Sequence, residues 1–347
     1  MKTCILWARA VVAAGLILIA CALFVNPSSV VAQNAEKSQP PTQPKLSEEE
    51  AKAATDINNA PDARAKLTAA TEFLKKYPKS EAREQVAGYI ATQVAQVPDA
   101  ATKLTLAEEF QRVFTEDSEI QFIRPVLIEA YLNAKRVDDA FNVGTTALAR
   151  DPENIHVLIQ LTFAGTEEAK RQNAKYVTQA LQYGQKAIGL IEGDKRPPRV
   201  DEAAWGNYKA LLGQLYQQTG ALELISGKPG EAKGRLEKAI QFDPKEPSSY
   251  VLLGYVINDE YINLATNYKA MPEGDEKAAT MKKIEGMMDN MIDLYARAVG
   301  LATGRPEYQS LIQQVMPDLT SYYKYRHNQS TDGLQQLIDK YKPTGTP

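Results

Sequence analysis

Cysteine is nearly absent from this chain of 347 residues. The two cysteines, Cys4 and Cys21, both lie within the first 32 residues. A chain cut after Ala32 therefore has no thiol, which excludes a disulfide framework, a thiolate metal site and a cysteine nucleophile. Absence of unpaired cysteine is also what an exported protein needs in an oxidising compartment.

Histidine is equally scarce, with only His156 and His327. Neither belongs to a His-Glu-x-x-His motif, so nothing indicates a zinc site. Gly227-Lys228 lacks the spacing and hydroxyl residue of a phosphate-binding loop. We expect no metal, no cofactor and no catalytic residue, and His156 is interpreted as a packing or solvated side chain.

A basic surplus is also missing, since the formal net charge is -3. Loss of the leader would remove Lys2 and Arg9, and no acidic residue, so the remaining chain is more acidic still. Nucleic-acid binders need a basic face that neutralises phosphates. We therefore expect no nucleic-acid partner.

The leader has the organisation of a secretory signal peptide over residues 1–32. A short basic segment precedes the apolar run Ala10–Val25, and Val30-Val31-Ala32 offers a small-residue cleavage site. The run is shorter than the ~20 residues of a membrane-spanning helix. We expect an exported protein in the periplasm or another extracytoplasmic space, with anchoring to the envelope as an open alternative.

Two other fates of the leader stay open. Leu18-Ile19-Ala20-Cys21 resembles the lipobox of bacterial lipoproteins, in which Cys21 becomes the acylated N-terminus. The apolar run continues past Cys21, which argues against lipidation. A leader that is retained as an uncleaved anchor is the third alternative, and only then or after lipidation is membrane association expected.

Residues 33–46 follow as a proline-rich, flexible linker. Ser47 and Glu50 then form a capping box, which predicts that the first helix begins here. No later stretch alternates apolar and polar residues as a half-buried strand does. We therefore predict an all-α body.

Internal repeats organise this body. Residues 61–73 and 98–110 share nine of thirteen positions at an offset of 37. In each copy the apolar residues recur every three or four positions, which places them on one face of a helix. The repeated unit is interpreted as a helical hairpin, and residues 47–117 as N-terminal hairpin repeats.

A more regular pattern follows over residues 118–303, with insertions. Its small and aromatic residues are spaced so that paired helices approach closely. The residues assigned to repeat packing are Leu127, Tyr131, Ala140, Gly144, Ala147, Leu212, Gly213, Tyr216, Ala232, Ala239, Leu253 and Gly254. This pattern resembles the tetratricopeptide repeat (TPR), a helix–turn–helix unit of about 34 residues. The resemblance implies a right-handed α-solenoid of TPR-like hairpins, with residues 304–347 as C-terminal capping helices and a short tail.

The resemblance also implies a binding groove, because the first helix of each unit lines the inner face in this family. The corresponding residues are Asn207, Gln214, Gln217, Gln218, Tyr255, Asn258 and Asp259. Carboxamides offer both a donor and an acceptor to the backbone of an extended peptide. We predict a non-catalytic scaffold that binds an unidentified protein or peptide on its concave face.

Two further functions are weighed against this one. A lipid-anchored factor of envelope or outer-membrane assembly would follow from acylation of Cys21. A carboxylate-dependent hydrolase would use Asp259 and Glu260, although neighbouring acids on a helix are usually solvated. Tyr322, Tyr323 and Tyr325 form an aromatic cluster that is interpreted mainly as packing of a final helix.

Overall fold

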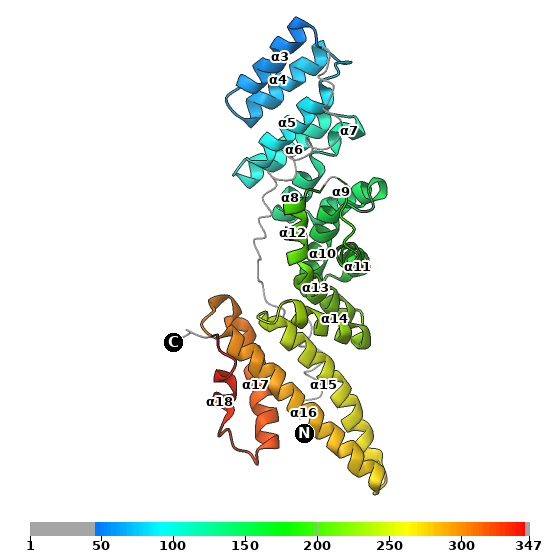
Figure 1. Ribbon diagram of the computed structural model, residues 1–347, viewed down its shortest axis with the longest axis vertical. Coiled ribbons are helices and arrows are strands. Elements are labelled where there is room, and N and C mark those ends of the chain that lie inside the picture. The colour runs from blue at the N-terminus through cyan, green and yellow to red at the C-terminus, as the bar shows by residue number, and fades with distance from the viewer. Residues whose placement is uncertain (1–45, 199, 344–347) are drawn as a thin grey trace. The chain divides into compact units, whose positions relative to one another are not determined.

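The computed structural model describes residues 46–198 and 200–343, and in these ranges every regular element is helical (Figure 1). They hold sixteen α-helices and two short 3-10 helices, with no strand. The all-α prediction is confirmed. The signal peptide, Cys21 and residues 33–45 of the predicted linker lie outside the described residues.

The described chain divides into two compact units. The N-terminal unit contains residues 46–164 and 189–210, and the C-terminal unit contains residues 165–188 and 211–343. The boundary between the units falls inside two helices, α10 (Ile155–Lys170) and α11 (Val177–Glu192), so each of these helices belongs partly to either unit. The 3-10 helix Ala174–Tyr176 separates α10 from α11. Each unit is therefore built from helices that are mostly, but not wholly, consecutive.

The N-terminal unit begins where the capping box places it. Its helices are α3 (Glu48–Asn59), α4 (Ala63–Lys76), α5 (Arg83–Ala95), α6 (Ala100–Val113), α7 (Asp117–Ile120), α8 (Arg124–Asn133), α9 (Val137–Arg150), the start of α10, and α12 (Glu202–Ala210). Ser47 Oγ accepts a hydrogen bond from the Glu50 amide at 3.2 Å, and the Glu50 carboxylate accepts from the Ser47 amide at 2.9 Å. This reciprocal cap satisfies two amides that a helix start leaves unpaired, and the prediction is confirmed.

The two sequence copies become α4 and α6. Asp62 and Asp99 occupy equivalent positions and cap these helices, each accepting a 2.8 Å hydrogen bond from the amide three residues later. The buried residues of α4 and α6 include Leu67, Phe73 and Phe110. The same local sequence thus builds the same helix start and the same apolar face twice.

The C-terminal unit contains the longest helices of the described chain. These are α15 (Pro247–Ala270) and α16 (Asp275–Ala302), with 24 and 28 residues. The unit also holds α13 (Leu212–Ile225), α14 (Pro229–Phe242), α17 (Gln309–Arg326) and α18 (Leu334–Asp339), with a 3-10 turn at Pro306–Tyr308 (Figure 1). Most of their buried apolar residues, from Ala221 to Ile338, form one contiguous core.

The insertions expected within residues 118–303 do not appear as long loops in the C-terminal unit. Only residues 226–228 separate α13 from α14, and only residues 271–274 separate α15 from α16. In α15 and α16 the additional residues lengthen the helices instead, to 24 and 28 residues. Adding a residue to an existing helix gains a hydrogen bond for each residue that is ordered, whereas a structureless loop gains none.

Each helix packs against its neighbours in the chain and often against the next but one. In the N-terminal unit α4 contacts α3, α5 and α6, and in the C-terminal unit α13 contacts α14 and α15. Contacts limited to near neighbours in sequence are the defining property of a helical repeat array. The prediction of TPR-like hairpins is confirmed, while the right-handed superhelix and the boundaries at 117 and 303 stay predictions.

Candidate functional site

The structure places six of the seven predicted groove residues on two helices of the C-terminal unit. Gln214, Gln217 and Gln218 lie partly exposed on α13, and α15 carries Tyr255, Asn258 and Asp259. Asn207 belongs to the N-terminal unit, where it is exposed on α12. The groove itself stays a prediction, but six of its residues share two neighbouring helices.

Part of the carboxamide row is already used within the molecule. Gln217 Nε2 donates to Ser249 Oγ on α15 at 3.2 Å, and Gln218 Nε2 donates to Gln217 Oε1 at 3.3 Å. These two hydrogen bonds fix the side chains of Gln217 and Gln218, and the first of them links α13 to α15. The row is therefore partly preorganised, which lowers the entropy cost of binding a partner there.

A second set of residues joins α15 to α17. Tyr322 Oη on α17 donates a 2.6 Å hydrogen bond to Asn258 Oδ1 on α15, and the rings of Tyr261 and Tyr322 lie 6.0 Å apart at 78°. Tyr325, one turn beyond Tyr322, leaves 55% of its surface exposed. We call the tyrosine face the set formed by Tyr255, Asn258, Tyr261, Asp318, Tyr322 and Tyr325.

Helical spacing explains why these side chains share a face. Asp318, Tyr322 and Tyr325 follow one another at intervals of four and three residues, and Tyr255, Asn258 and Tyr261 at intervals of three. Residues three or four apart lie on the same side of a helix. Each helix therefore presents one stripe to the tyrosine face.

The tyrosine face is anchored to the core at one end. The Tyr255 ring packs edge-on against Tyr295, with centroids 6.3 Å apart, and Tyr295 is fully buried. Burial, together with the nearby Asp318 carboxylate, raises the pKa of Tyr255 to about 12. Burial and the neighbouring Tyr325 also raise the pKa of Tyr261. Both hydroxyls therefore stay protonated near neutral pH and remain hydrogen-bond donors.

Asp318 places a carboxyl group on this face. Its side chain is exposed, yet the surrounding helices remove enough water from its carboxyl group to raise its pKa. No basic side chain of the described residues pairs with it.

Tyr322, Tyr323 and Tyr325 form one cluster in the sequence, and the structure separates them. Tyr323 is buried and donates to the Asp332 carbonyl at 2.8 Å, so it packs the final helix as expected. Tyr322 and Tyr325 belong to the tyrosine face instead. Tyr261 and Asp318 were missed, although their three- and four-residue spacing from Asn258 and Tyr322 was a usable signal.

The residues assigned to repeat packing are all buried. At three of these glycines an added methyl group would crowd a neighbouring residue. An added Cβ at Gly144 would lie 2.5 Å from Leu161, one at Gly213 would lie 3.0 Å from Asp243, and one at Gly254 would lie 2.2 Å from Tyr295. Close approach of the paired helices thus depends on the missing side chains.

His156 meets Tyr208 within the N-terminal unit. Tyr208 Oη and His156 Nδ1 are 3.3 Å apart, and the two rings meet edge to face with centroids 6.4 Å apart. Burial lowers the pKa of His156 to about 4 and raises that of Tyr208. The imidazole is therefore neutral near pH 7 and acts as a packed hydrogen-bonding group.

Asp259 and Glu260, the two carboxylates considered for hydrolysis, have different partners in the structure. Both Glu260 oxygens accept from Lys233 Nζ at 3.2 Å, whereas exposed Asp259 contacts Asn263 at 3.5 Å. Adjacent helix positions differ by about 100° in direction, so the two carboxylates leave α15 in different directions. Over residues 46–198 and 200–343, no three His, Cys, Asp or Glu side chains gather as metal ligands would.

Membrane contact was expected only through the leader. Among the helices of the described chain, none combines the length and the apolarity that crossing a bilayer requires. Lipidation at Cys21 and the uncleaved anchor concern residues outside this description and stay predictions.

Comparison with solved structures returns helical repeat proteins. A thermophilic TPR protein of Thermus thermophilus is 17% identical, with a TM-score of 0.35, and the match covers 69% of this chain and 98% of that one. The MamA protein is 14% identical with a TM-score of 0.36, covering 65% and 98%. A TPR protein from Parabacteroides merdae is 14% identical with a TM-score of 0.37, covering 84% and 96%. No family model and no curated protein matches the chain. Similarity at this level identifies no ligand, so the fold assignment depends on the helix packing described above.

Proposed function

We propose that this chain is an exported, non-catalytic scaffold that binds a partner protein or peptide through the inner surface of its C-terminal unit. The observation that carries the proposal is the tyrosine face, in which partly exposed aromatic rings lie on helices α15 and α17. Its mechanism is binding to a preorganised surface, with no covalent step.

Partly exposed tyrosines support recognition because burying their apolar ring surface against a partner is favourable. Tyrosine is enriched at protein interfaces, where one ring supplies apolar area and one hydroxyl supplies a directional hydrogen bond. Here the Asn258–Tyr322 hydrogen bond and the packing of Tyr255 on Tyr295 restrict the rotamers before a partner arrives. Little side-chain entropy then remains to be lost on binding.

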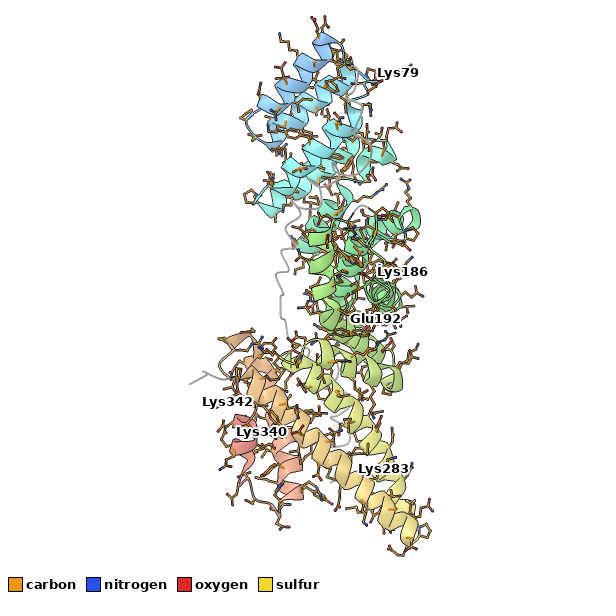
Figure 2. All side chains as sticks on the ribbon, in the orientation of Figure 1. Lys79, Lys186, Glu192, Lys283, Lys340 and Lys342 are labelled. Carbon is orange, nitrogen blue, oxygen red and sulfur yellow. The ribbon has the colours of Figure 1, made fainter. Side chains whose placement is uncertain are left out.

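The test is site-specific photo-crosslinking in the native envelope. A photoreactive residue replaces Gln214 or Tyr325, and the matched control position is Lys283, an exposed residue of α16 in the same unit (Figure 2). We expect a discrete crosslinked partner from Gln214 and Tyr325 and none from Lys283. No product from the first two positions, or the same product from Lys283, would contradict the proposal.

Export is part of the proposal and has its own test. Cleavage after Ala32 predicts a mature protein that begins at Gln33, whereas the lipid-anchored alternative predicts an acylated Cys21. Intact-mass spectrometry of protein from the native host distinguishes the two termini. A Cys21→Ser variant is the control, because it blocks lipidation and leaves the Ala32 site unchanged. We expect the same Gln33 terminus in both chains, and a lipid-bearing wild-type chain would favour the envelope-assembly alternative.

A further inference from the structure

We infer that helices α13 and α14 form a second binding site, which takes a carboxylate and an apolar side chain from one segment of a partner protein. We call the arginine site the set formed by Tyr216, Glu223, Arg235, Lys238 and Phe242. None of these residues belongs to the tyrosine face, so the inference goes beyond the proposed function. Three observations carry it: the fixed guanidinium of Arg235, the charge balance of the site and the exposed ring of Phe242.

A fully buried carboxylate holds Arg235 from one side. Glu223 on α13 is 0% exposed, and its Oε1 accepts from Arg235 Nε on α14 at 3.2 Å and from Gln185 Nε2 on α11 at 3.4 Å. Its second oxygen, Oε2, is buried and has no hydrogen-bond partner among the described residues. An unpaired buried acceptor costs free energy, and such departures from full pairing are expected at functional sites. Here the buried glutamate fixes the direction of the Arg235 guanidinium.

The outer edge of the Arg235 guanidinium remains for a ligand. Its hydrogen bond to the described residues uses Nε, and 28% of the side chain is exposed. Nη1 and Nη2 therefore form a fork that has no acceptor within the described chain. Two N–H groups arranged in this way match two oxygens of a carboxylate or a phosphate. Because Glu223 restrains the guanidinium in advance, little side-chain entropy is lost when the anion binds.

The charge of the arginine site fits an anion with a single charge. Lys238 Nζ donates to Tyr216 Oη at 2.8 Å and lies 4.9 Å from the centroid of that ring. Arg235 Cζ lies 5.9 Å from the same centroid, so both cations lie against one ring. Two cations and the buried Glu223 leave these side chains with a net charge of +1. A carboxylate carries one negative charge, whereas a phosphate ester carries about 1.5 to 2, so the balance favours a carboxylate.

Phe242 supplies the apolar half of the site. Its side chain is strongly exposed, at 49%, and its ring stacks parallel to Tyr216 with centroids 5.8 Å apart. The neighbouring Asp243 carboxylate accepts from the Lys245 amide at 3.2 Å. Arg235 and Phe242 are seven residues apart on α14, which is a rise of about 10.5 Å. Residues three apart in an extended chain are separated by about 10 Å, so an acidic and an apolar residue at this spacing reach both groups.

Fluorescence anisotropy with the full-length protein tests the inference. The probes are two labelled glycine–serine peptides with one glutamate and one phenylalanine three positions apart, one peptide for each order, and both have an amidated C-terminus. The comparison peptides replace the glutamate by glutamine or phosphoserine, or the phenylalanine by serine. We expect saturable binding of a glutamate–phenylalanine probe, and about tenfold weaker binding once the glutamate becomes glutamine. Tighter binding of the phosphoserine peptide would overturn the inference, because the ligand would then be a phosphate.

Three variants test the residues of the site. Arg235→Lys keeps the charge and removes the fork, so it should weaken binding of the probe about tenfold. Glu223→Gln makes the site more positive, yet it should also weaken binding, because the guanidinium loses the carboxylate that orients it. The matched control, Lys283→Gln, removes one charge from α16 in the same unit and should leave binding unchanged (Figure 2). Urea transitions followed by circular dichroism establish that each variant is folded.

Unchanged binding in Arg235→Lys, tighter binding in Glu223→Gln, or equal loss in Lys283→Gln would overturn the inference. So would concentration-dependent self-association that Arg235→Lys abolishes, because the occupant would then be a second copy. The proposed function is tested at Gln214 and Tyr325, neither of which belongs to the arginine site. Either proposal can therefore fail while the other stands.

Discussion

At the scale of single residues, missing side chains determine how closely the helices pair. Gly254 on α15 lies against Tyr295 on α16, a ring that is only 1% exposed. The ring cannot rotate into solvent to make room, because the core surrounds it. A residue with no catalytic or binding role thus sets the distance between the two helices that support the tyrosine face.

Gly254→Ala should destabilise the C-terminal unit by about 1–3 kcal/mol, because the added methyl group overpacks the core against Tyr295. Gly286→Ala on α16 is the matched control, since an added Cβ there meets nothing within 4 Å. That change should stabilise the helix by up to about 1 kcal/mol. Urea midpoints followed by circular dichroism measure both effects, and a stabilised Gly254→Ala chain would contradict the packing argument.

His156 should make the free energy of unfolding decrease as the pH falls. Its folded-state pKa of about 4 lies below the ordinary value of 6.5, so the unfolded chain takes up the proton first as pH falls. The contribution of the neutral imidazole is complete above pH 6.5 and is lost as pH falls toward 4, by at most about 3 kcal/mol. Urea midpoints of the wild type and of His156→Gln should converge between these pH values. A constant difference across the range would show that burial does not hold this histidine neutral.

At the scale of elements, one ion pair holds the short helix α7 against α5. Arg83 Nε and Nη2 donate to the two oxygens of Glu119 at 2.7 and 3.1 Å, and the Glu119 side chain is 2% exposed. A helix of four residues does not persist alone, because nucleation costs more than so few hydrogen bonds return. Tertiary contacts such as this pair therefore keep α7 in place.

Arg83→Met should cost about 3–5 kcal/mol, because it leaves the Glu119 carboxylate buried without its partner. The double variant Arg83→Met with Glu119→Leu should recover much of that loss, since no uncompensated charge remains. Urea denaturation of both single variants and the double variant completes the cycle. Additive losses would show that the two side chains do not act as a pair.

At the scale of the whole molecule, the division into two units should be visible in unfolding. Loss of the leader removes Trp7 and leaves Trp205 as the sole tryptophan. Trp205 is buried in the N-terminal unit, where its Nε1 donates to Asp194 at 2.9 Å. Its fluorescence therefore reports on one unit, whereas circular dichroism at helical wavelengths reports on both.

Helical arrays gain stability from near-neighbour contacts and need not unfold in one step. We expect the urea transitions followed by fluorescence and by circular dichroism to differ in midpoint. Gly254→Ala should shift the circular-dichroism transition and leave the fluorescence transition nearly unchanged. Coincident transitions that shift together in this variant would show that the two units unfold as one.

Local patterns in the sequence determined the class of the fold. Ser47 with Glu50 marks the first helix, and the spacing of Ala140, Gly144 and Ala147 marks a buried helix face, because capping and helical periodicity involve residues at most a few positions apart. The groove residues came instead from the resemblance to the tetratricopeptide repeat, and six of them lie on α13 and α15. The repeat pattern indicated insertions within residues 118–303, but not that α15 and α16 would be long helices, because such a pattern does not reveal where a helix stops.

Only the tertiary structure brought the tyrosine face together. Asn258 and Tyr322 are 64 residues apart in sequence, and their hydrogen bond depends on how α15 and α17 both pack on the same core. Periodicity shows which side chains share one helix face, but the position of that face against another helix is set by glycines such as Gly254 and by the side chains opposite them. The sequence by itself therefore determined the helices, and packing between distant helices decided which tyrosines meet and which one is buried.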